Sequence, residues 1–454
     1  MKLSKILIPI AMAVFTVEAV PVYKEPIQAV EATPRKGVGN FLAKVKAGKP
    51  VTVAYLGGSI TAQGDSRTNK GGWRVKTTKW LRDTYPQAQI TEIDAAIGGT
   101  GSNLGAYRVG YDALRHNPDL LFVEFACNDG GDNGNPEGIW RSMEGIVRQT
   151  WKQNPRTDII FAYTITTSMT NTYSKGFRPR AAGCDDMLAD HYGIPSIDFG
   201  PRVWKAVAEN KLMMTGKDIE TAVPKEDPEY DKKVREMFAK DPRILFSNDG
   251  VHPRDEGHDF YLESIKAGFA AMKNLPPVDH GPSLVSPFID GNMENAKLVD
   301  IKPSMLTGDW TTLPCEVKKY DALRHFSNRF GDKIYIARKP GSKISFKFKG
   351  SQCQIYDLLG PDCAQLWITV DGKRRANPVA RFDSYCTYYR LASLYIGGGK
   401  DEVHTVEVEI DSKQPSRKSV AFRLKNPEKE LKGEMFDGTT WIVGKIMLIG
   451  DIVD

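Results

Sequence analysis

Four short blocks of the sequence carry residue types that together suit acyl transfer. They are Gly57-Gly58-Ser59-Ile60-Thr61, Ile97-Gly98-Gly99-Thr100-Gly101, Ala126-Cys127-Asn128-Asp129 and Asn248-Asp249-Gly250-Val251-His252-Pro253. A serine becomes nucleophilic when a histidine removes its proton and a carboxylate fixes the tautomer of that histidine. Asp249 and His252, three residues apart, can supply both groups. Backbone N–H groups at glycine-rich turns and an asparagine amide are suitable donors to an oxyanion.

The first three blocks each follow a segment whose pattern predicts a buried strand. Between residues 50 and 273, short β-branched runs alternate with segments of helical periodicity, which predicts a parallel sheet covered on both faces. The expected strands are Val51 to Leu56, Ile90 to Ala96, Leu120 to Phe125, Ile159 to Thr166 and Ile194 to Phe199. Ligands of such sheets bind beyond the carboxyl ends of the strands, where these blocks are expected. The fourth block directly precedes the last expected helix, from about Arg254 to Met272.

In their order, the four blocks resemble those of the SGNH (GDSL-type) hydrolases, which are named after a Ser, a Gly, an Asn and a His in successive blocks. The resemblance extends over residues 50 to 273 and implies that Ser59 is the nucleophile of a triad with Asp249 and His252. It also implies an oxyanion hole formed by the N–H groups of Ser59 and Gly99 and the side chain of Asn128. The usual Gly-Asp-Ser is here Gly-Gly-Ser, and the usual Gly-Asn-Asp is Cys-Asn-Asp; both departures retain every catalytic group.

Each block taken alone has another explanation. Ser59 after two glycines is typical of a turn or helix cap, and Thr61 stands where the nucleophile elbow of α/β-hydrolases has glycine. The glycines at 98, 99 and 101 have the wrong spacing for a dinucleotide. Residues 129 to 135 lack the alternating carboxylates of a calcium loop. Cys127 is typical of a small buried residue and His258 of a structural helix residue. We therefore expect neither a metal nor a cofactor.

The length of 454 residues predicts two domains. Residues 33–278 are expected to form a flavodoxin-like, three-layer α/β/α hydrolase domain, interrupted by a charged helical excursion over 205–241. A proline-rich and glycine-containing linker follows. Residues 283–454 contain runs of period two, such as Lys343 to Phe348 and Thr405 to Ile410, which predict an all-β, jelly-roll-like sandwich.

The first twenty residues have the features of a signal peptide. Lys2 and Lys5 precede an apolar run from Ile6 to Val17. Small residues stand where a signal peptidase would cut, at Val17, the end of the run, and at Ala19. The run is too short to span a bilayer, so residues 1–20 predict export to a periplasm or the outside of the cell.

Charge and cysteine content narrow the class of partner. The 62 basic and 56 acidic residues are interspersed, which argues against nucleic acid. The six cysteines lack metal-type spacing. Cys127 and Cys184 are expected to be free, whereas export would permit a disulfide among the other four, Cys315, Cys353, Cys363 and Cys386.

The expected function is that of an exported serine esterase acting on O-acyl, above all O-acetyl, groups of a glycan. Trp73, Trp140 or aromatic residues of the β domain are candidates to stack on sugar rings, although each also suits a core. Two alternatives remain: a general short-acyl or lipase-like esterase, and a catalytically idle glycan-binding protein. The sequence leaves the oligomeric state open.

Overall fold

Runs of buried aliphatic residues form a six-stranded sheet in the N-terminal domain of the computed structural model, which describes residues 21–62, 71–313, 318–331 and 333–453. The signal peptide expected at residues 1–20 lies outside these ranges. The parallel strands are β2 (Val51–Gly57), β3 (Ile90–Ala96), β4 (Leu120–Glu124), β5 (Asp158–Tyr163) and β6 (Ser196–Asp198). A short strand, β1 (Ala32–Thr33), pairs antiparallel with β6. The order β1-β6-β5-β4-β2-β3 confirms the flavodoxin-like prediction.

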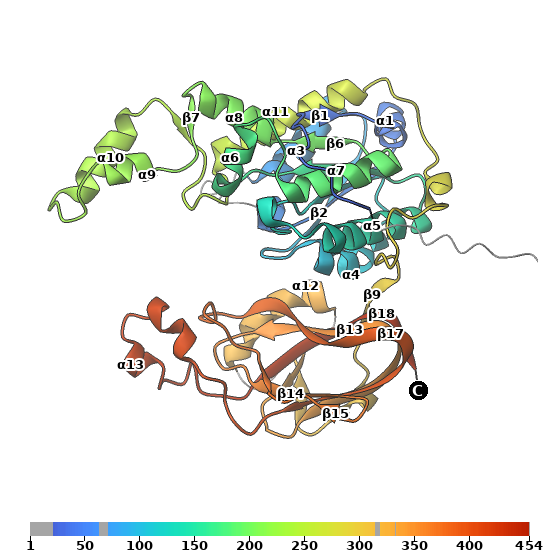
Figure 1. Cartoon of the computed structure of the whole chain (residues 1–454), viewed down its shortest axis with the longest axis vertical. Coiled ribbons are helices and arrows are strands. Elements are labelled where there is room, and N and C mark those ends of the chain that lie inside the picture. The colour runs from blue at the N-terminus through green and yellow to red at the C-terminus, as the bar shows by residue number, and fades with distance from the viewer. Residues whose placement is uncertain (1–20, 63–70, 314–317, 332, 454) are drawn as a thin grey trace, which may run out of the picture.

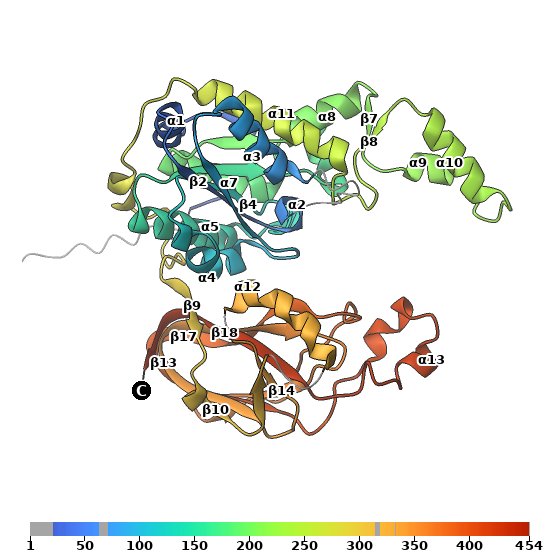
Figure 2. The same ribbon diagram turned by 180° about the vertical axis from the view of Figure 1, so that it is seen from behind.

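Alternation along the strands divides the domain core into two clusters. Ala54 and Leu56 of β2 face one cluster, while Val53 and Tyr55 face the other. The first cluster is covered by three helices, α4 (Ser102–Asp112), α5 (Pro136–Gln153) and α7 (Arg180–Tyr192). The second is covered by α1 (Gly39–Lys46), α3 (Trp73–Thr84), α8 (Gly200–Ala208) and α11 (Asp255–Met272). This arrangement gives the three expected layers (Figures 1 and 2).

The charged excursion is helical as expected, but it begins later than residue 205. Lys205 belongs to α8, whose apolar face packs with α11 in the second cluster. The excursion lies between two short paired strands, β7 (Leu212–Met213) and β8 (Ile244–Leu245), and contains α9 (Lys217–Thr221) and α10 (Tyr230–Lys240). No residue of α10 is buried, and the excursion projects from the domain as an arm (Figure 1).

The paired strands of the C-terminal domain run antiparallel, which confirms the predicted all-β fold. Within the described residues, its ten strands form one hydrogen-bonded sheet rather than two separate sheets, because the long strands β13 (Lys343–Leu359) and β17 (Arg390–Ile410) curve around the domain core (Figure 2). The two runs of period two lie in these strands and pair with each other, with Ile344 opposite Val408. The remaining strands are β9 (Ala296–Asp300), β10 (Leu306–Thr307), β11 (Trp310–Thr312), β12 (Tyr335–Ala337), β14 (Gln365–Val370), β15 (Lys373–Arg374), β16 (Val379–Ala380) and β18 (Trp441–Val453).

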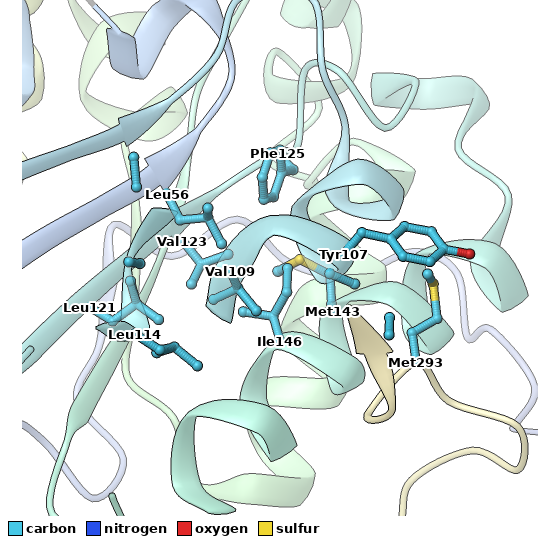
Figure 3. Packing of buried hydrophobic residues seen from close by; sticks show 14 of the residues in the cluster. Leu56, Tyr107, Val109, Leu114, Leu121, Val123, Phe125, Met143, Ile146 and Met293 are labelled. Carbon is cyan, nitrogen blue, oxygen red and sulfur yellow. The ribbon is translucent and has the colours of Figure 1, made fainter. Parts of the chain in front are cut away.

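The segment between the domains packs against both of them. Glu144 of α5 accepts hydrogen bonds from the N–H groups of Phe288 (2.5 Å) and Ile289 (2.9 Å). Met293 packs beside Met143 and Tyr107 (Figure 3) and belongs to a buried cluster that also contains Phe330 and Tyr356 of the β domain. The linker is therefore part of a shared core and holds the β domain against α4 and α5.

Candidate active site

Ser59, His252 and Asp249 form a connected chain of hydrogen bonds at the carboxyl edge of the parallel sheet. Ser59 is the first residue of a short helix, α2 (Ser59–Ala62), directly after β2. Its Oγ lies 2.8 Å from Nε2 of His252, and Nδ1 of His252 lies 2.7 Å from Oδ2 of Asp249. All three residues are at least partly exposed to solvent. This geometry allows His252 to accept the Ser59 proton while Asp249 holds the ring.

The loop that carries Asp249 is shaped by hydrogen bonds to that carboxylate. Its Oδ1 accepts the N–H groups of Val251 and His252, both at 2.9 Å, and the hydroxyl of Ser247 at 3.0 Å. Partial burial raises the pKa of Asp249, but the hydrogen bonds from His252 and the two backbone N–H groups outweigh it and lower this pKa below its usual range. Asp249 is therefore ionised in the folded protein at ordinary pH. Gly250 has a φ of +82°, which favours glycine at the tip of the turn.

Asn128 lies directly against Gly58, the glycine that precedes Ser59. A Cβ built on Gly58 would overlap Oδ1 of Asn128, so a side chain at position 58 would displace the asparagine. Asn128 follows β4, the neighbour of β2, at the point where the strand order reverses. The Gly-Gly-Ser departure thus has a local cause in this chain: Asn128 occupies the space of a side chain at 58.

The second glycine block forms a turn between β3 and α4. Gly99 has a φ of +72°, a left-handed conformation that favours glycine, and it is exposed. A Cβ on Gly98 would lie 3.5 Å from Cβ of Ser59, which places this turn beside Ser59. Ser59, Gly99 and Asn128, the three residues expected to donate to an oxyanion, are thus carried by adjacent loops.

Asp129 links the asparagine block to the glycine block. Its Oδ1 accepts the N–H of Ser102 at 2.8 Å, in the first turn of α4, whereas its Oδ2 is buried without a hydrogen-bond partner in the described structure. Burial raises the pKa of Asp129 to about 6, although the hydrogen bonds from Ser102 lower it. The residue after Asn128 therefore acts as a helix cap at the cost of a buried carboxyl group.

Glu124 is a residue at this site that the sequence analysis did not identify. It is the last residue of β4 and is fully buried, and its two oxygens accept the hydroxyls of Thr61 and Thr164, each at 2.7 Å. The N–H of Gly58 also bonds to it, yet burial raises its pKa overall. Glu124 thus ties the loop that carries Ser59 to two central strands. A carboxylate within an apolar strand was the available signal in the sequence.

Two other candidate nucleophiles or bases have structural positions. Burial raises the pKa of the Cys127 thiol to about 12, and the nearby carboxylates of Glu124, Asp129 and Asp249 act in the same direction, so Cys127 is protonated and a poor nucleophile. His258 is fully buried on α11, and its Nδ1 accepts the N–H of Trp73 at 3.2 Å.

All cysteines among the described residues are free thiols, namely Cys127, Cys184, Cys353, Cys363 and Cys386. Cys315 is outside the described residues.

The suggestion that Trp73 or Trp140 stacks on sugar rings is wrong. Trp73 is fully buried among Tyr55, Phe122 and Phe199, and the indole N–H of Trp140 donates to the Cys184 carbonyl inside the first cluster. Both positions lie on the inward faces of helices, so packing takes both side chains into the core. Exposed aromatic side chains occur instead on the β domain, at Tyr385 (51%), Tyr388 (57%), Tyr395 (51%) and Phe422 (72%).

A cavity of about 350 Å³ adjoins the loop of Asp249 and His252. Asn248 and Arg254, which flank this loop, line the cavity together with Gly216 and with Phe238 of α10. Its remaining wall is formed by Met213, Glu220, Arg243 and Leu245. The projecting arm therefore contributes to a mixed polar and apolar cavity whose lining includes Asn248, the residue before Asp249.

Within the part of the chain that the structure describes, no three His, Cys, Asp or Glu side chains are grouped to hold a metal ion. Likewise, none of the helices in the described ranges is long and apolar enough to cross a membrane.

Comparison with known proteins gives matches at the level of family and fold. Residues 55–260 match the GDSL-like lipase/acylhydrolase family. A two-domain esterase active on acetylated mannans, crystallised with mannopentaose, superposes with a TM-score of 0.66 at 18% identity, covering 91% of this chain and 94% of its own. A second structure of a two-domain esterase active on acetylated mannans gives 0.65 at 19% identity, with coverages of 90% and 93%. A lipase/acylhydrolase from Enterococcus faecalis, at 17% identity, covers 50% of this chain and 98% of its own with a TM-score of 0.32. No curated protein matches this sequence.

Proposed function

We propose that this chain, whose residues 55–260 match the GDSL-like lipase/acylhydrolase (SGNH) family, is an exported serine esterase that removes acetyl groups from a glycan. The observation that carries the proposal is the hydrogen-bonded chain from Ser59 Oγ through His252 to Asp249, with distances of 2.8 and 2.7 Å. A serine on an exposed turn has no structural need for such a chain, whereas acyl transfer requires it.

The proposed reaction proceeds through an acyl-enzyme. Ser59 Oγ attacks the ester carbonyl while His252 Nε2 takes its proton, and the negative charge that develops on the carbonyl oxygen is held by the N–H groups of Ser59 and Gly99 and the Asn128 amide. His252 then returns the proton to the sugar oxygen as the ester bond breaks. Water, deprotonated by His252, attacks the acyl-enzyme and releases acetate, and the proton returns to Ser59. Asp249, kept ionised by its hydrogen bonds, stabilises the imidazolium in both steps.

Three observations support a glycan as the alcohol part of the ester. The two-domain architecture is shared along nine-tenths of the chain with esterases active on acetylated mannans. The cavity beside the triad combines Arg243, Arg254 and Glu220 with the ring of Phe238, a mixture that suits hydroxyl groups and the apolar faces of sugars. Tyr385 and Phe422 flank Arg423 on the exposed surface of the β domain, with its guanidinium 4.2 and 5.1 Å from the two ring centroids.

The β domain is proposed as an accessory domain that holds the polymer. The segment around α13 (Pro427–Glu430) projects from the same side of the molecule as α9 and α10, the arm that lines the cavity (Figures 1 and 2). Export, proposed from the first twenty residues of the sequence, would bring the enzyme to such polymers.

Acetate release is the test of this proposal. The mature protein, Ser59→Ala and the control Ser174→Ala, which replaces an exposed serine bonded only to its own helical turn, are assayed on 4-nitrophenyl acetate and on acetylated mannan and xylan. We expect release by the wild type and by Ser174→Ala, and loss of release in Ser59→Ala.

Each alternative has its own outcome. Activity on aryl acetates and longer acyl esters but on no polysaccharide would indicate a general short-acyl esterase. Binding to a glycan without any ester hydrolysis would indicate an idle binding protein. Hydrolysis that persists in Ser59→Ala would contradict the serine mechanism.

A further inference from the structure

An arginine of the β domain reaches the strand end that leads into the Gly98–Gly99 turn. Arg329 lies on the short helix α12 (Ser327–Phe330), and its guanidinium donates to the carbonyl of Ala96, the last residue of β3, at 2.9 Å. Its other terminal nitrogen lies 3.7 Å from Oδ2 of Asp112 at the end of α4, and its side chain is only 15% exposed. The contact therefore crosses the interface and ends next to the glycine block.

Asp112 is shared with a second arginine that holds the neighbouring loop. Arg108, one turn earlier on α4, is fully buried and pairs with Asp112 at 2.9 Å. Arg108 also donates to the carbonyl of Ala95 and, at 3.0 Å, to that of Gly57, the last residue of β2. The Gly57 carbonyl accepts the N–H of Ile97 as well, at 2.9 Å. One carboxylate thus joins two arginines that bind the ends of both strands preceding Ser59 and Gly99.

The helix that carries Arg329 is fixed by packing. Phe330 is buried, its ring lies edge-on to Tyr356 at 5.0 Å, and it contacts Gly444 so closely that any Cβ there would overlap the ring. Tyr356 and Gly444 belong to β13 and β18, the long strands of the β domain. A guanidinium held in this way is a rigid fork of donors, and a rigid donor can orient the carbonyls it binds.

We propose that Arg329 is a positioning residue, through which the β domain holds the turn of Gly98 and Gly99 in the geometry required for oxyanion binding. Arg108 has the same role for the turn of Gly58 and Ser59. The inference rests on the proposed function, because it assumes that the Gly99 N–H faces the reacting carbonyl. It makes the β domain a part of the catalytic architecture in addition to any role in holding polymer.

The test uses a substrate too small to need the β domain for binding. Arg329→Met, Arg329→Lys, Ser59→Ala and the control Lys445→Met are prepared in the full chain and assayed on 4-nitrophenyl acetate. Lys445 is a matched interface cation: it is 4.6 Å from the ring centroid of Tyr111 on α4 and pairs with Asp300 of its own domain. We expect Arg329→Met to lower kcat about tenfold with little change in KM, since a displacement of 1 Å can cost about 100-fold. Arg329→Lys should recover part of the loss, and Lys445→Met, which removes no hydrogen bond to the end of β2 or β3, should keep kcat near the wild-type value.

Hydrogen exchange supplies a readout that does not depend on activity. Faster exchange of the amides of residues 97–101 in Arg329→Met, and not in Lys445→Met, is expected. Unchanged exchange at this turn, unchanged kcat, or an equal loss in Lys445→Met would each overturn the proposal for Arg329. Failure of the proposed function would appear differently, as activity that survives in Ser59→Ala or is missing from the wild type, and the exchange data would then still decide whether Arg329 holds the turn.

Discussion

Ser59 Oγ lies 2.8 Å from Nε2 of His252, although 193 positions separate the two residues in the chain. The carboxyl end of β2 and the loop before α11 meet at one edge of the sheet, and this places the two side chains in direct contact. The serine and the histidine are supported independently, by Glu124 beneath the first loop and by Asp249 within the second.

Removal of either end of this contact is expected to abolish turnover. Ser59→Ala or His252→Ala should lower kcat on 4-nitrophenyl acetate by roughly 10⁴-fold, because members of a triad act as a unit. The double variant should lose little more than either single one, and steady-state kinetics of all three provides the measurement. Losses that multiply in the double variant would show that the two residues act separately.

Asn128→Ala is expected to lower kcat by roughly 100- to 1,000-fold with a small effect on KM, as for other single donors to an oxyanion. The donor is needed most when negative charge develops on the substrate oxygen, so the loss should fall on the chemical step. An increase in KM at constant kcat would instead assign Asn128 to substrate binding.

Gly58→Ala tests whether the space beside the nucleophile is reserved for Asn128. A Cβ at position 58 would overlap Oδ1 of Asn128, so the variant should displace the amide and reproduce most of the Asn128→Ala loss, roughly 100-fold in kcat. Gly110→Ala is the matched control, because a Cβ there meets no atom within 4 Å. Wild-type activity in Gly58→Ala would show that the asparagine tolerates displacement.

Asp129 is expected to make stability depend on pH in the acid range. Its pKa is raised to about 6 in the folded protein against about 3.9 in an unfolded chain, so the folded state binds the extra proton between these values. The contribution of this group to the free energy of unfolding therefore falls as pH rises from about 4 to about 6 and stays low above that range. The free energy of unfolding of Asp129→Asn, relative to that of the wild type, should rise by about 1 to 3 kcal/mol from about pH 4 to about pH 7.5.

Urea denaturation of wild type and Asp129→Asn at about pH 4 and about pH 7.5 measures the difference between their free energies of unfolding. Asp83→Asn, which replaces an exposed aspartate, is measured alongside as a control for the substitution itself. A gain for Asp129→Asn that is equal at both pH values would contradict a raised pKa for this carboxyl group.

The exposed aromatic pair of the β domain should matter for polymer only. Tyr385→Ala combined with Phe422→Ala is expected to raise KM on an acetylated polysaccharide about fivefold, the effect of losing roughly 1 kcal/mol of stacking, and to leave aryl acetate hydrolysis unchanged. Tyr395→Ala is the control. Tyr395 is as exposed as Tyr385, but it lies beside Arg375 and not beside Arg423, the residue that Tyr385 and Phe422 flank. Equal effects of the control and the double variant would argue against a defined sugar site at Tyr385 and Phe422.

Much of the fold and the outline of the site follow from local patterns in the sequence. Apolar runs and their periods predicted the parallel strands, and the turn residues after Leu56, Ala96 and Phe125 marked the edge where Ser59, Gly99 and Asn128 lie. The spacing of three between Asp249 and His252 was sufficient to predict that both lie on one turn. An aspartate carboxylate readily accepts the N–H groups of residues two and three positions ahead, as Asp249 does here. These features depend on short stretches of chain, so a single sequence reveals them.

Tertiary structure alone decided which side chains became core and which ones support the site from a distance. Trp73 and Trp140 are buried because helices α3 and α5 present them to opposite faces of one sheet. The periodicity of the sequence does not show whether such a tryptophan faces the core or the solvent. The contact of Arg329 with Ala96 joins residues 233 positions apart, and it exists because the linker packs the β domain against α4. Such contacts arise from the packing of two complete domains, and no local preference of the chain encodes them.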